Sequence, residues 1–409
     1  MLFEKACLES FMTYLFVFVF LSFLGVYFYY HPNSKFYLFA KFAAFVIFVY
    51  LAGMRYELGV DYFAYAHHFE NYINLTDLFQ NGWPRTSYEP GFVLFMIVLR
   101  SVFDNPQFLF FSASLICSIL LFYSLTQLTE RRMFFLSVLV YFSFVYLLLE
   151  MHALRQAMAA SVSYLAWVFM AKNKNVKALL FIFLAMQFHS SATFLLPIYL
   201  FLNRSINLKI QAILLSVSTI VMVLQFKWID FFVRLLENLV PFMASVIKLA
   251  IYTNTEQHSR SVFLLYFIYL FVYIYMLYKR RVVNENSVDV SPSVTLFEKL
   301  FFFFLIVTSL FWEINYLSIR LGWYLLFGFV LLFPYMTSNL KLLNPSYMLV
   351  FVILLCFYPT RHFIFPNEET AQFSPYEDYI QCKILDLECS GRNRADQYIY
   401  SVGGHFLFY

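Results

Sequence analysis

Long apolar segments alternate with short polar ones along almost the whole chain. A helix that crosses a lipid bilayer needs about 20 mostly apolar residues, and ten segments reach or approach that length. They comprise residues 11–30, 36–54, 108–127, 133–150, 154–171, 210–226, 261–278, 300–317, 322–336 and 347–365. The pattern predicts an all-α, polytopic integral membrane protein, with about ten spanning helices in a single membrane domain over residues 1–409.

Basic residues collect in cytoplasmic loops, so their distribution predicts which way the chain faces. The strongest basic clusters are Arg131-Arg132, residues 172–177 and residues 279–281. The loop 55–90 and the tail 366–409 each carry more acidic than basic residues. We therefore expect the loop and the tail on the external side, together with both chain termini.

Two apolar segments do not fit this topology as ordinary spans. Residues 92–103 are too short to cross the bilayer. Residues 178–202 must enter and leave on the same side, and their length is too small for two full spans. A re-entrant hairpin broken at His189-Ser190-Ser191 fits both conditions. Because irregular backbone at that depth is tolerated only inside protein or beside a water-filled cavity, we expect a polar cavity that opens outward.

The external loop 227–260 has an amphipathic pattern. Apolar residues recur at helical spacing from Trp228 to Ala250, while charged side chains such as those of Asp230 and Glu237 fall on the other side. This pattern predicts a helix that lies on the membrane surface. A lid over the cavity is the alternative interpretation.

Composition narrows the class further. Hydrophobic residues make up 62% of the chain and charged residues 13%, whereas about a quarter of a soluble domain is charged. This excludes a soluble enzyme, a disordered chain and a nucleic-acid binder. The five cysteines form no CxxC pair and no Cys/His cluster, so no metal site is predicted. Cys382 and Cys389 in the tail could form a disulfide, because such bonds persist outside the cytoplasm.

Three arginines stand at the external ends of predicted spans, where the positive-inside bias disfavours them. They are Arg55, Arg155 and Arg320. An arginine presents a planar fork of donors that suits phosphate oxygens, so the group indicates an anionic ligand such as a lipid-linked diphosphate. Pairing with a neighbouring carboxylate, such as Glu150 or Glu313, is the structural alternative for each arginine.

Candidate acid–base groups lie on the same external side. Asp61 and Glu89 could bind or deprotonate a sugar hydroxyl, although a loop salt bridge would also explain either carboxylate. His189 is the other candidate base, because an imidazole group ordinarily titrates near neutral pH, but a hydrogen-bonded structural histidine is equally consistent with its position. Flat rings that could face a sugar are those of Tyr62, Tyr65 and Tyr88. His67 and His68 are expected to be solvated.

Several of these residues belong to short motifs that follow one another along nearly the whole chain. The motifs are Arg55-x-x-x-Gly59-x-Asp61-Tyr62-x-x-Tyr65, Glu89-Pro90-Gly91-Phe92, Leu154-Arg155-Gln156, Phe188-His189-Ser190-Ser191-Ala192, Arg320-x-x-x-Tyr324 and, in the tail, Pro375-Tyr376. In this order they resemble the EpsG-like group of Wzy-type O-antigen and exopolysaccharide polymerases. Val60 departs from the pattern, which favours a small polar residue there.

This resemblance implies an integral membrane glycosyltransferase in the bacterial cytoplasmic (inner) membrane, with its active face toward the periplasm or exterior. Such an enzyme joins oligosaccharide repeat units, carried on undecaprenyl diphosphate, into O-antigen, capsule or exopolysaccharide. The resemblance implies no cofactor and no metal; membrane lipid and a chain-length regulator are the further partners. The alternatives are an O-antigen ligase-like lipid-sugar transferase and a flippase or exporter of lipid-linked oligosaccharide.

We expect three roles among the candidate residues. Arg155 and Arg320, with help from Arg55, would hold the diphosphate and neutralise it as the sugar leaves. Either His189 or Asp61 would take the proton from the attacking hydroxyl. The residues expected to position the acceptor or bind substrate are Glu89, Tyr62, Tyr65, Tyr88, Gln156 and Tyr324.

Overall fold

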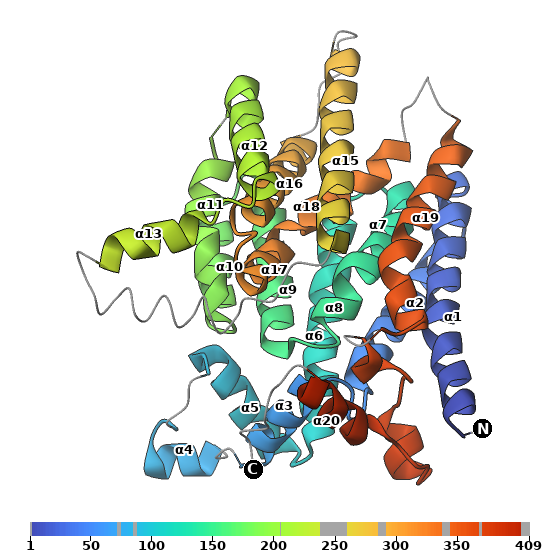
Figure 1. Cartoon of the computed structure of the whole chain (residues 1–409). Coiled ribbons are helices and arrows are strands. Elements are labelled where there is room, and N and C mark those ends of the chain that lie inside the picture. Colours follow the sequence, from blue (N-terminus) through green and yellow to red (C-terminus); the bar gives the residue numbers. More distant parts are fainter. Residues whose placement is uncertain are drawn as a thin grey trace. The chain divides into compact units, whose positions relative to one another are not determined.

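The structure is a computed structural model of the chain. It describes residues 2–71, 75–84, 88–204, 206–237, 260–284, 292–337, 344–367 and 370–401. Within these ranges every named element is a helix or a helical turn (Figure 1). The all-α class predicted from the apolar pattern is therefore confirmed.

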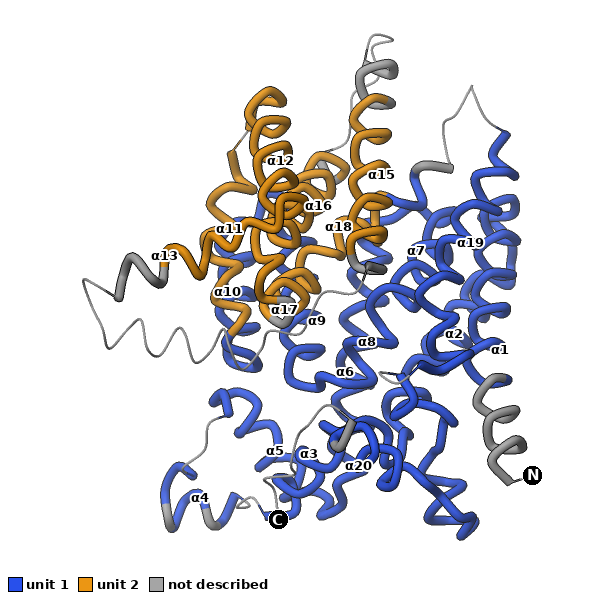
Figure 2. The backbone as a smooth tube through the Cα atoms, in the orientation of Figure 1, with its two compact units in different colours: residues 1–190, 333–409 blue, residues 191–332 orange. Residues whose placement is uncertain are grey.

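The helices form two compact units, which Figure 2 colours separately. The first unit comprises residues 1–190 and 333–409, and the second comprises residues 191–332. The first unit thus combines both ends of the chain, whereas the second is one internal stretch.

The first unit is built on a bundle of apolar helices. Its members are α1 (Leu2–Tyr30), α2 (Tyr37–Gly53), α6 (Pro106–Leu128), α7 (Arg131–Tyr141), α8 (Leu147–Leu149), α9 (Leu154–Ala171), α10 (Asn175–Met186) and α19 (Pro345–Ile364). A π-helical turn, Phe142–Tyr146, joins α7 to α8. The most extensive packing is between α9 and α10, α1 and α7, α2 and α6, and α6 and α9. Every residue of α7 from Met133 onward is buried, so α7 runs through the interior of this unit.

A group of short helices comes from the loop after α2 and from the C-terminal tail. They are α3 (Val60–Asn71), α4 (Leu75–Asn81), α5 (Pro90–Val102) and α20 (Gly391–Ser401), with single turns at Ala371–Phe373 and Ile380–Ile384. Helix α20 packs on α3, and a backbone bridge joins Arg55 to Asp378. The loop and the tail, which the charge pattern assigns to one side of the membrane, therefore lie side by side (Figure 1).

The second unit packs around α16 (Pro292–Leu310). Its other helices are α11 (Leu195–Leu202), α12 (Leu208–Val223), α13 (Trp228–Glu237), α15 (Arg260–Asn284), α17 (Asn315–Leu325) and α18 (Phe327–Leu332). The ring of Tyr269 meets those of Phe301 and Phe329 with centroids 6.2 and 4.9 Å away. Gly328 lets α18 approach α16 closely, because a Cβ there would lie 2.7 Å from the Phe297 carbonyl oxygen.

Among the residues that the structure describes, five helical stretches are long and apolar enough to cross a membrane. They are Met12–Tyr30, Pro106–Leu128, Arg131–Leu149, Leu317–Tyr335 and Pro345–Ile364. Shorter apolar helices cover Tyr37–Gly53, Pro90–Val102, Asn175–Met186, Ser190–Leu202, Leu208–Val223 and Phe263–Tyr278. Each of the ten predicted spans lies on a helix, although α16 ends at Leu310 rather than at residue 317. The chain is a multi-pass membrane protein.

The apolar segment 178–202 is broken where the sequence places its polar residues. Helix α10 ends at Met186, a 3₁₀ turn covers Ser190–Phe194, and α11 begins at Leu195. Each of the two helices is too short to span a bilayer, since the structure gives α10 12 residues and α11 8 residues. The re-entrant path of this segment stays a prediction.

Part of the predicted amphipathic segment 227–260 is α13; residues 238–259 lie outside the described residues. Helix α13 exposes the rings of Phe231 and Phe232. At its N-terminus the Glu313 carboxylate accepts hydrogen bonds from the amides of Ile229 and Asp230, at 3.0 Å each. A carboxylate at this end satisfies unpaired helix donors and opposes the helix dipole, so Glu313 anchors α13 to its unit.

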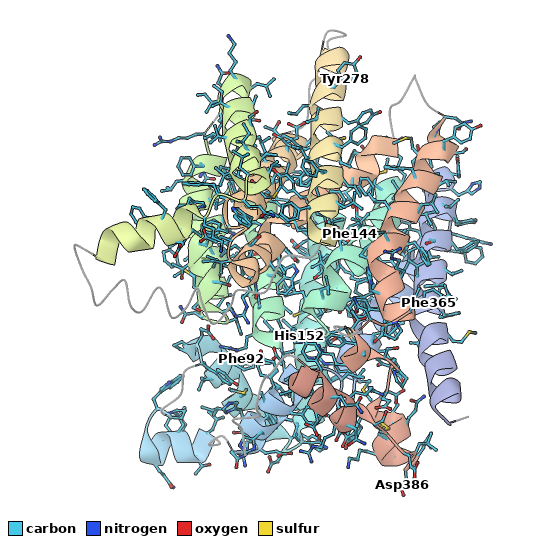
Figure 3. The ribbon with its side chains drawn as sticks, viewed as in Figure 1. Phe92, Phe144, His152, Tyr278, Phe365 and Asp386 are labelled. Atoms are coloured by element: carbon cyan, nitrogen blue, oxygen red, sulfur yellow. A yellow bond between two sulfur atoms is a disulfide. The ribbon has the colours of Figure 1, made fainter. Side chains whose placement is uncertain are left out.

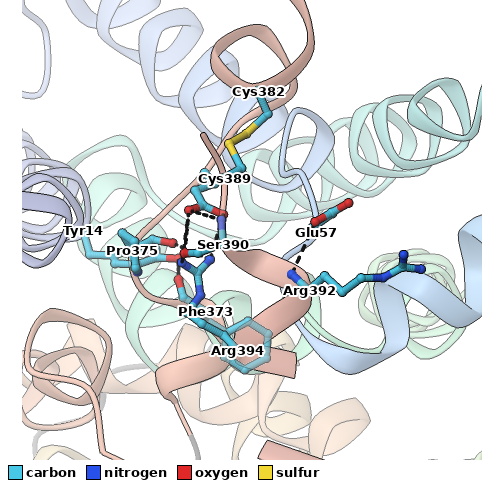
Figure 4. A network of polar contacts seen from close by, with 10 residues as sticks. Tyr14, Glu57, Phe373, Pro375, Cys382, Cys389, Ser390, Arg392 and Arg394 are labelled. Atoms are coloured by element: carbon cyan, nitrogen blue, oxygen red, sulfur yellow. Dashed lines mark hydrogen bonds and ion pairs between the residues drawn. A yellow bond between two sulfur atoms is a disulfide. The ribbon is translucent and has the colours of Figure 1, made fainter. Parts of the chain in front are cut away.

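The tail is cross-linked within itself (Figure 4). Cys382 and Cys389 form a disulfide with their Cα atoms 5.8 Å apart, as the sequence spacing allowed. The Arg394 guanidinium donates two hydrogen bonds, of 3.1 and 3.0 Å, to the Glu377 carboxylate. Both side chains of this pair are 11% exposed, so the fork holds α20 to the preceding segment.

Candidate functional site

The turn between α2 and α3 carries the first motif and is held by the C-terminal tail. Gly59 has a φ of +80°, a conformation that L side chains rarely adopt. A Cβ at Gly59 would also lie 2.7 Å from the Phe373 ring. The next amide, that of Val60, donates to the Gln372 side chain at 3.0 Å. The glycine of the motif thus lets the tail pack against the start of α3.

Arg55 lies in the protein interior, with 1% of its surface exposed. Its Nη1 donates to the carbonyl oxygens of Glu150 and Ala52 at 2.6 and 3.2 Å, and its guanidinium carbon lies 4.9 Å from the Phe110 ring centroid. The guanidinium therefore ties the end of α2 to the turn between α8 and α9. Its expected contact with the diphosphate stays a prediction.

Glu89 and Arg155 form the central contact of the candidate site. Arg155 Nη1 donates to Glu89 Oε2 at 2.7 Å, and the other oxygen, Oε1, accepts from the Ser190 amide at 2.7 Å. The Glu89 side chain is 12% exposed and the Arg155 side chain is 21% exposed. Burial alone would raise the pKa of Glu89, but the Ser190 amide and the Arg155 charge outweigh it and hold the pKa below its usual value. Glu89 is therefore a carboxylate at neutral pH.

Gly91 brings this carboxylate to the broken segment after α10. A Cβ on Gly91 would lie 2.7 Å from Gln187 Cβ and 2.8 Å from the Gln187 carbonyl oxygen. That carbonyl accepts from the Phe92 amide at 3.1 Å, in the first turn of α5. Pro90 suits that turn, because it needs no amide donor there. The motif Glu89-Pro90-Gly91-Phe92 thus docks α5 on the end of α10, and Phe92 is labelled there in Figure 3.

Aromatic rings surround the arginine. The Arg155 guanidinium carbon lies 4.3 Å from the centroid of the Tyr88 ring, a cation–π distance. The ring of Tyr65 lies 6.3 Å from Tyr88 and 5.8 Å from Phe92. Burial raises the pKa of Tyr65 to about 12; Asp61 raises it too, while Arg155 opposes the shift. Tyr65 is therefore a neutral phenol beside a fixed positive charge.

The two candidate bases, His189 and Asp61, differ in burial and in their neighbours. His189 is 6% exposed and lies close enough to Glu89 to favour its ionised form. Asp61 is half-buried in the first turn of α3, one turn before Tyr65. His189 is thus a neighbour of Glu89 and Asp61 a neighbour of Tyr65, and the role of either as the base stays a prediction.

Two other predicted residues, Tyr62 and Gln156, lie in the protein interior. Tyr62 is 6% exposed and stacks on Phe110, with centroids 4.4 Å apart and planes 11° apart. Gln156 is 1% exposed and follows Arg155 on α9. Their expected contacts with substrate stay predictions.

Arg320 and Tyr324 belong to the second unit and lie one turn apart on α17. Arg320 is half-buried, and Tyr324 is fully buried. The Tyr324 hydroxyl lies 2.9 Å from Ser191 Oγ. Within the second unit, the last motif therefore contacts Ser191. Ser191 directly follows Ser190, whose amide binds Glu89.

Two groups at the candidate site were not predicted from the sequence: the His68 ring and the Ser190 main-chain amide. His67 is exposed as expected, but His68 is half-buried and its ring meets Tyr88 with centroids 4.7 Å apart. Burial, and then the charges of His67 and Arg155, lower the pKa of His68. The run of aromatic residues after Asp61 in the sequence could have indicated that His68 lies at the site. The sequence could not indicate the role of the Ser190 main-chain amide, because that role does not depend on the serine side chain.

The site is rich in hydrogen-bonding and charged groups but has no cluster of metal-ligand type. Among the residues that the structure describes, no three His, Cys, Asp or Glu side chains come together as a metal site would require. The arrangement can instead bind an anion at Arg155, hold a hydroxyl at Glu89 and face a sugar ring with tyrosines. These features define a class: a multi-pass α-helical membrane protein with a charged, aromatic-lined site beside the loop that follows α2.

The chain belongs to the EpsG family, whose sequence pattern matches residues 40–377. That range includes every candidate site residue. Family membership supports a polysaccharide polymerase-like, glycosyltransferase-like role at the level of the family. No curated protein and no solved structure matches the chain.

Proposed function

We propose that this protein is a polysaccharide polymerase that joins oligosaccharide repeat units carried on undecaprenyl diphosphate. The observation that carries the proposal is the contact of Arg155 with Glu89, which the Ser190 amide completes at the broken segment. Membership in the EpsG family supports the same class of reaction. The product would be O-antigen, capsule or exopolysaccharide.

Arg155 is the proposed binding group for the diphosphate. Its Nη1 donates a hydrogen bond to Glu89, and its buried Nε has no hydrogen-bond partner among the described residues. A buried donor without a partner is costly, and a phosphate oxygen would satisfy it. As the bond between the sugar and the diphosphate breaks, negative charge grows on the leaving group. A fixed guanidinium stabilises that charge more than it stabilises the ground state.

The acceptor hydroxyl would be held and deprotonated beside the same pair. Glu89 is ionised, so its oxygens accept hydrogen bonds and can orient a hydroxyl. His189 or Asp61 takes the proton as the hydroxyl oxygen attacks the anomeric carbon. Tyr65 and Tyr88 present rings and hydroxyls to the sugar. Roles for Arg55, Tyr62, Gln156, Arg320 and Tyr324 in binding substrate are proposed from the sequence resemblance.

The proposed location is the bacterial cytoplasmic membrane, with the site facing the periplasm or exterior. The disulfide between Cys382 and Cys389 supports this side, because disulfides persist in oxidising compartments. The acidic loop 55–90, which packs on the disulfide-bearing tail, supports it as well. Membrane lipid and a chain-length regulator are the proposed partners.

The direct test is turnover of purified protein with lipid-linked repeat units in vesicles. Elongation to products of two or more units supports the polymerase. Movement of the substrate across the bilayer without elongation would indicate a flippase or exporter. Transfer of glycan only to a lipid-core acceptor would indicate a ligase. Either of the last two results contradicts the proposal.

A further inference from the structure

A cavity lies between α3, the start of α6 and the C-terminal tail. Its volume is about 390 Å³, within the range of about 300–1,000 Å³ that is typical of pockets for small ligands. Its lining includes Tyr56 before α3, Asn105 before α6 and Arg392 in α20. All of these residues belong to the first unit.

The cavity is distinct from the candidate diphosphate site. Helix α3 separates them, since Tyr65 lies beside Arg155 while Phe63 and Ala66 line the cavity. Neither Glu89 nor Arg155 is among the lining residues.

The lining combines aromatic rings with hydrogen-bonding groups. The rings of Tyr56 and Tyr379 meet with centroids 5.9 Å apart, and the Tyr379 hydroxyl accepts from Asn105 Nδ2 at 3.0 Å. Phe63 and Tyr62 add two further rings. Flat rings cover the C–H faces of a sugar, and carboxylate, amide and phenol groups bind its hydroxyls. Such a mixture suits a saccharide better than an apolar ligand.

The charges of the lining disfavour an anionic ligand. The carboxylates are those of Glu57, Glu70 and Asp396, whereas Lys383 and Arg392 are the cations. Both cations are exposed and lie over rings, Lys383 at 5.5 Å from Tyr56 and Arg392 at 5.5 Å from Phe63. Exposed cation–π contacts are worth only about 0.5–1 kcal/mol, so an uncharged sugar can displace them.

We propose that this cavity binds sugar residues of the repeat-unit oligosaccharide, as a saccharide subsite separate from the diphosphate site. The proposal deepens the proposed function and rests on it for the source of the sugar. Helix α3 then serves both sites, with Tyr65 turned to one and Phe63 to the other. The subsite would hold the glycan while Arg155 holds the diphosphate.

The test measures binding of free glycan, without lipid or phosphate, to the full-length protein in detergent. The probe is the oligosaccharide released by mild acid from the cell's own polysaccharide, followed by saturation-transfer NMR. We expect Phe63→Ala to weaken the Kd about tenfold, the scale of one lost ring contact. Asp396→Asn is a second cavity variant, which keeps the side-chain volume and should weaken the Kd about threefold. Glu388→Gln, an exposed change outside the cavity lining, is the control.

The outcomes separate this subsite from the proposed function. Arg155→Ala should retain free-glycan binding, because it does not line the cavity. Absence of binding to the wild-type protein, or normal binding by both cavity variants, overturns the subsite even if lipid-linked units are elongated. Competition by inorganic pyrophosphate at this site would also overturn it. If the glycan binds through Phe63 but no elongation occurs, the subsite stands and the polymerase proposal fails.

Discussion

Arg155 Nη1 lies 2.7 Å from Glu89 Oε2, although 66 residues separate the two in the chain. Arg155 opens α9, a helix buried along most of its length, and Glu89 precedes the short helix α5. The contact therefore joins the apolar bundle to the loop that follows α2. Substitutions at these two positions test the site most directly.

Arg155→Ala should leave the protein inserted but abolish long polymer, so that single repeat units accumulate. Loss of one charge-stabilising donor lowers rates by about 10²–10³-fold. Arg155→Lys keeps the charge but not the fork, and an intermediate chain length is expected from it. Gel analysis of the polymer, normalised to protein in the membrane, measures both. Polymer of normal length from Arg155→Ala would refute the diphosphate role.

Arg320→Ala should give the same loss of long polymer if Arg320 helps to hold the diphosphate. Arg204→Ala is the matched control, because that side chain is exposed in the same unit and is no part of the candidate motifs. The two variants are compared by polymer length at equal protein level. Equal chain lengths from both would remove Arg320 from the proposed site.

The charge of Glu89 predicts how stability depends on pH. Its folded-state pKa is held below the ordinary 4.5, so its contribution is fully present above pH 4.5 and is lost as the pH falls through the lower folded value. Glu89→Gln should lower thermal stability at pH 7, where hydrogen bonds to a charged group contribute about 1.5–3 kcal/mol. The deficit should shrink below pH 4.5. Melting curves in detergent from pH 3.5 to 7 measure it, and a deficit that does not change with pH contradicts the assignment.

Gly91→Ala should disrupt the site without removing any charged group. The added Cβ would clash with the Gln187 backbone oxygen at 2.8 Å, so α5 must move and Glu89 must leave the Ser190 amide. Gly82→Ala is a control in the same loop. Gly82 also has a positive φ, but its Cβ would meet nothing within 4 Å. We expect polymer loss for Gly91→Ala and near-normal polymer for Gly82→Ala; the reverse order would contradict the docking role.

Removal of the tail disulfide should destabilise the group of short helices that the loop after α2 and the tail form together. A bond that closes a short loop contributes about 2–3 kcal/mol in the chain-entropy account. Replacing Cys382 and Cys389 with serine should therefore lower the melting temperature. Non-reducing mass spectrometry of the wild-type tail peptide should find the two cysteines linked. Two free thiols in protein taken directly from cells would show that the tail is not in an oxidising compartment.

The apolar pattern predicted the helical membrane architecture well, because spans are specified by local composition and length. It placed the end of α16 too late: residues 311–314 form a turn in which Glu313 caps α13, a long-range role that local hydropathy does not register. The motifs named both Glu89 and Arg155 as candidate site residues but did not predict the contact between them. Arg55 was expected to help hold the diphosphate; its hydrogen bonds to two backbone carbonyls were not predicted. Such partners depend on tertiary packing and leave no pattern in the sequence.

The pinning of the α3 turn by Gln372 has a consequence for biogenesis. Val60 emerges from the ribosome 312 residues before the side chain that its amide binds. The start of α3 therefore cannot complete its packing until translation is nearly finished and Gln372 has been synthesised. A nascent chain that stalls before residue 370 would contain all the predicted apolar spans but lack the Gln372 contact that holds the start of α3. Such a chain should be more susceptible to cellular proteases than the complete protein.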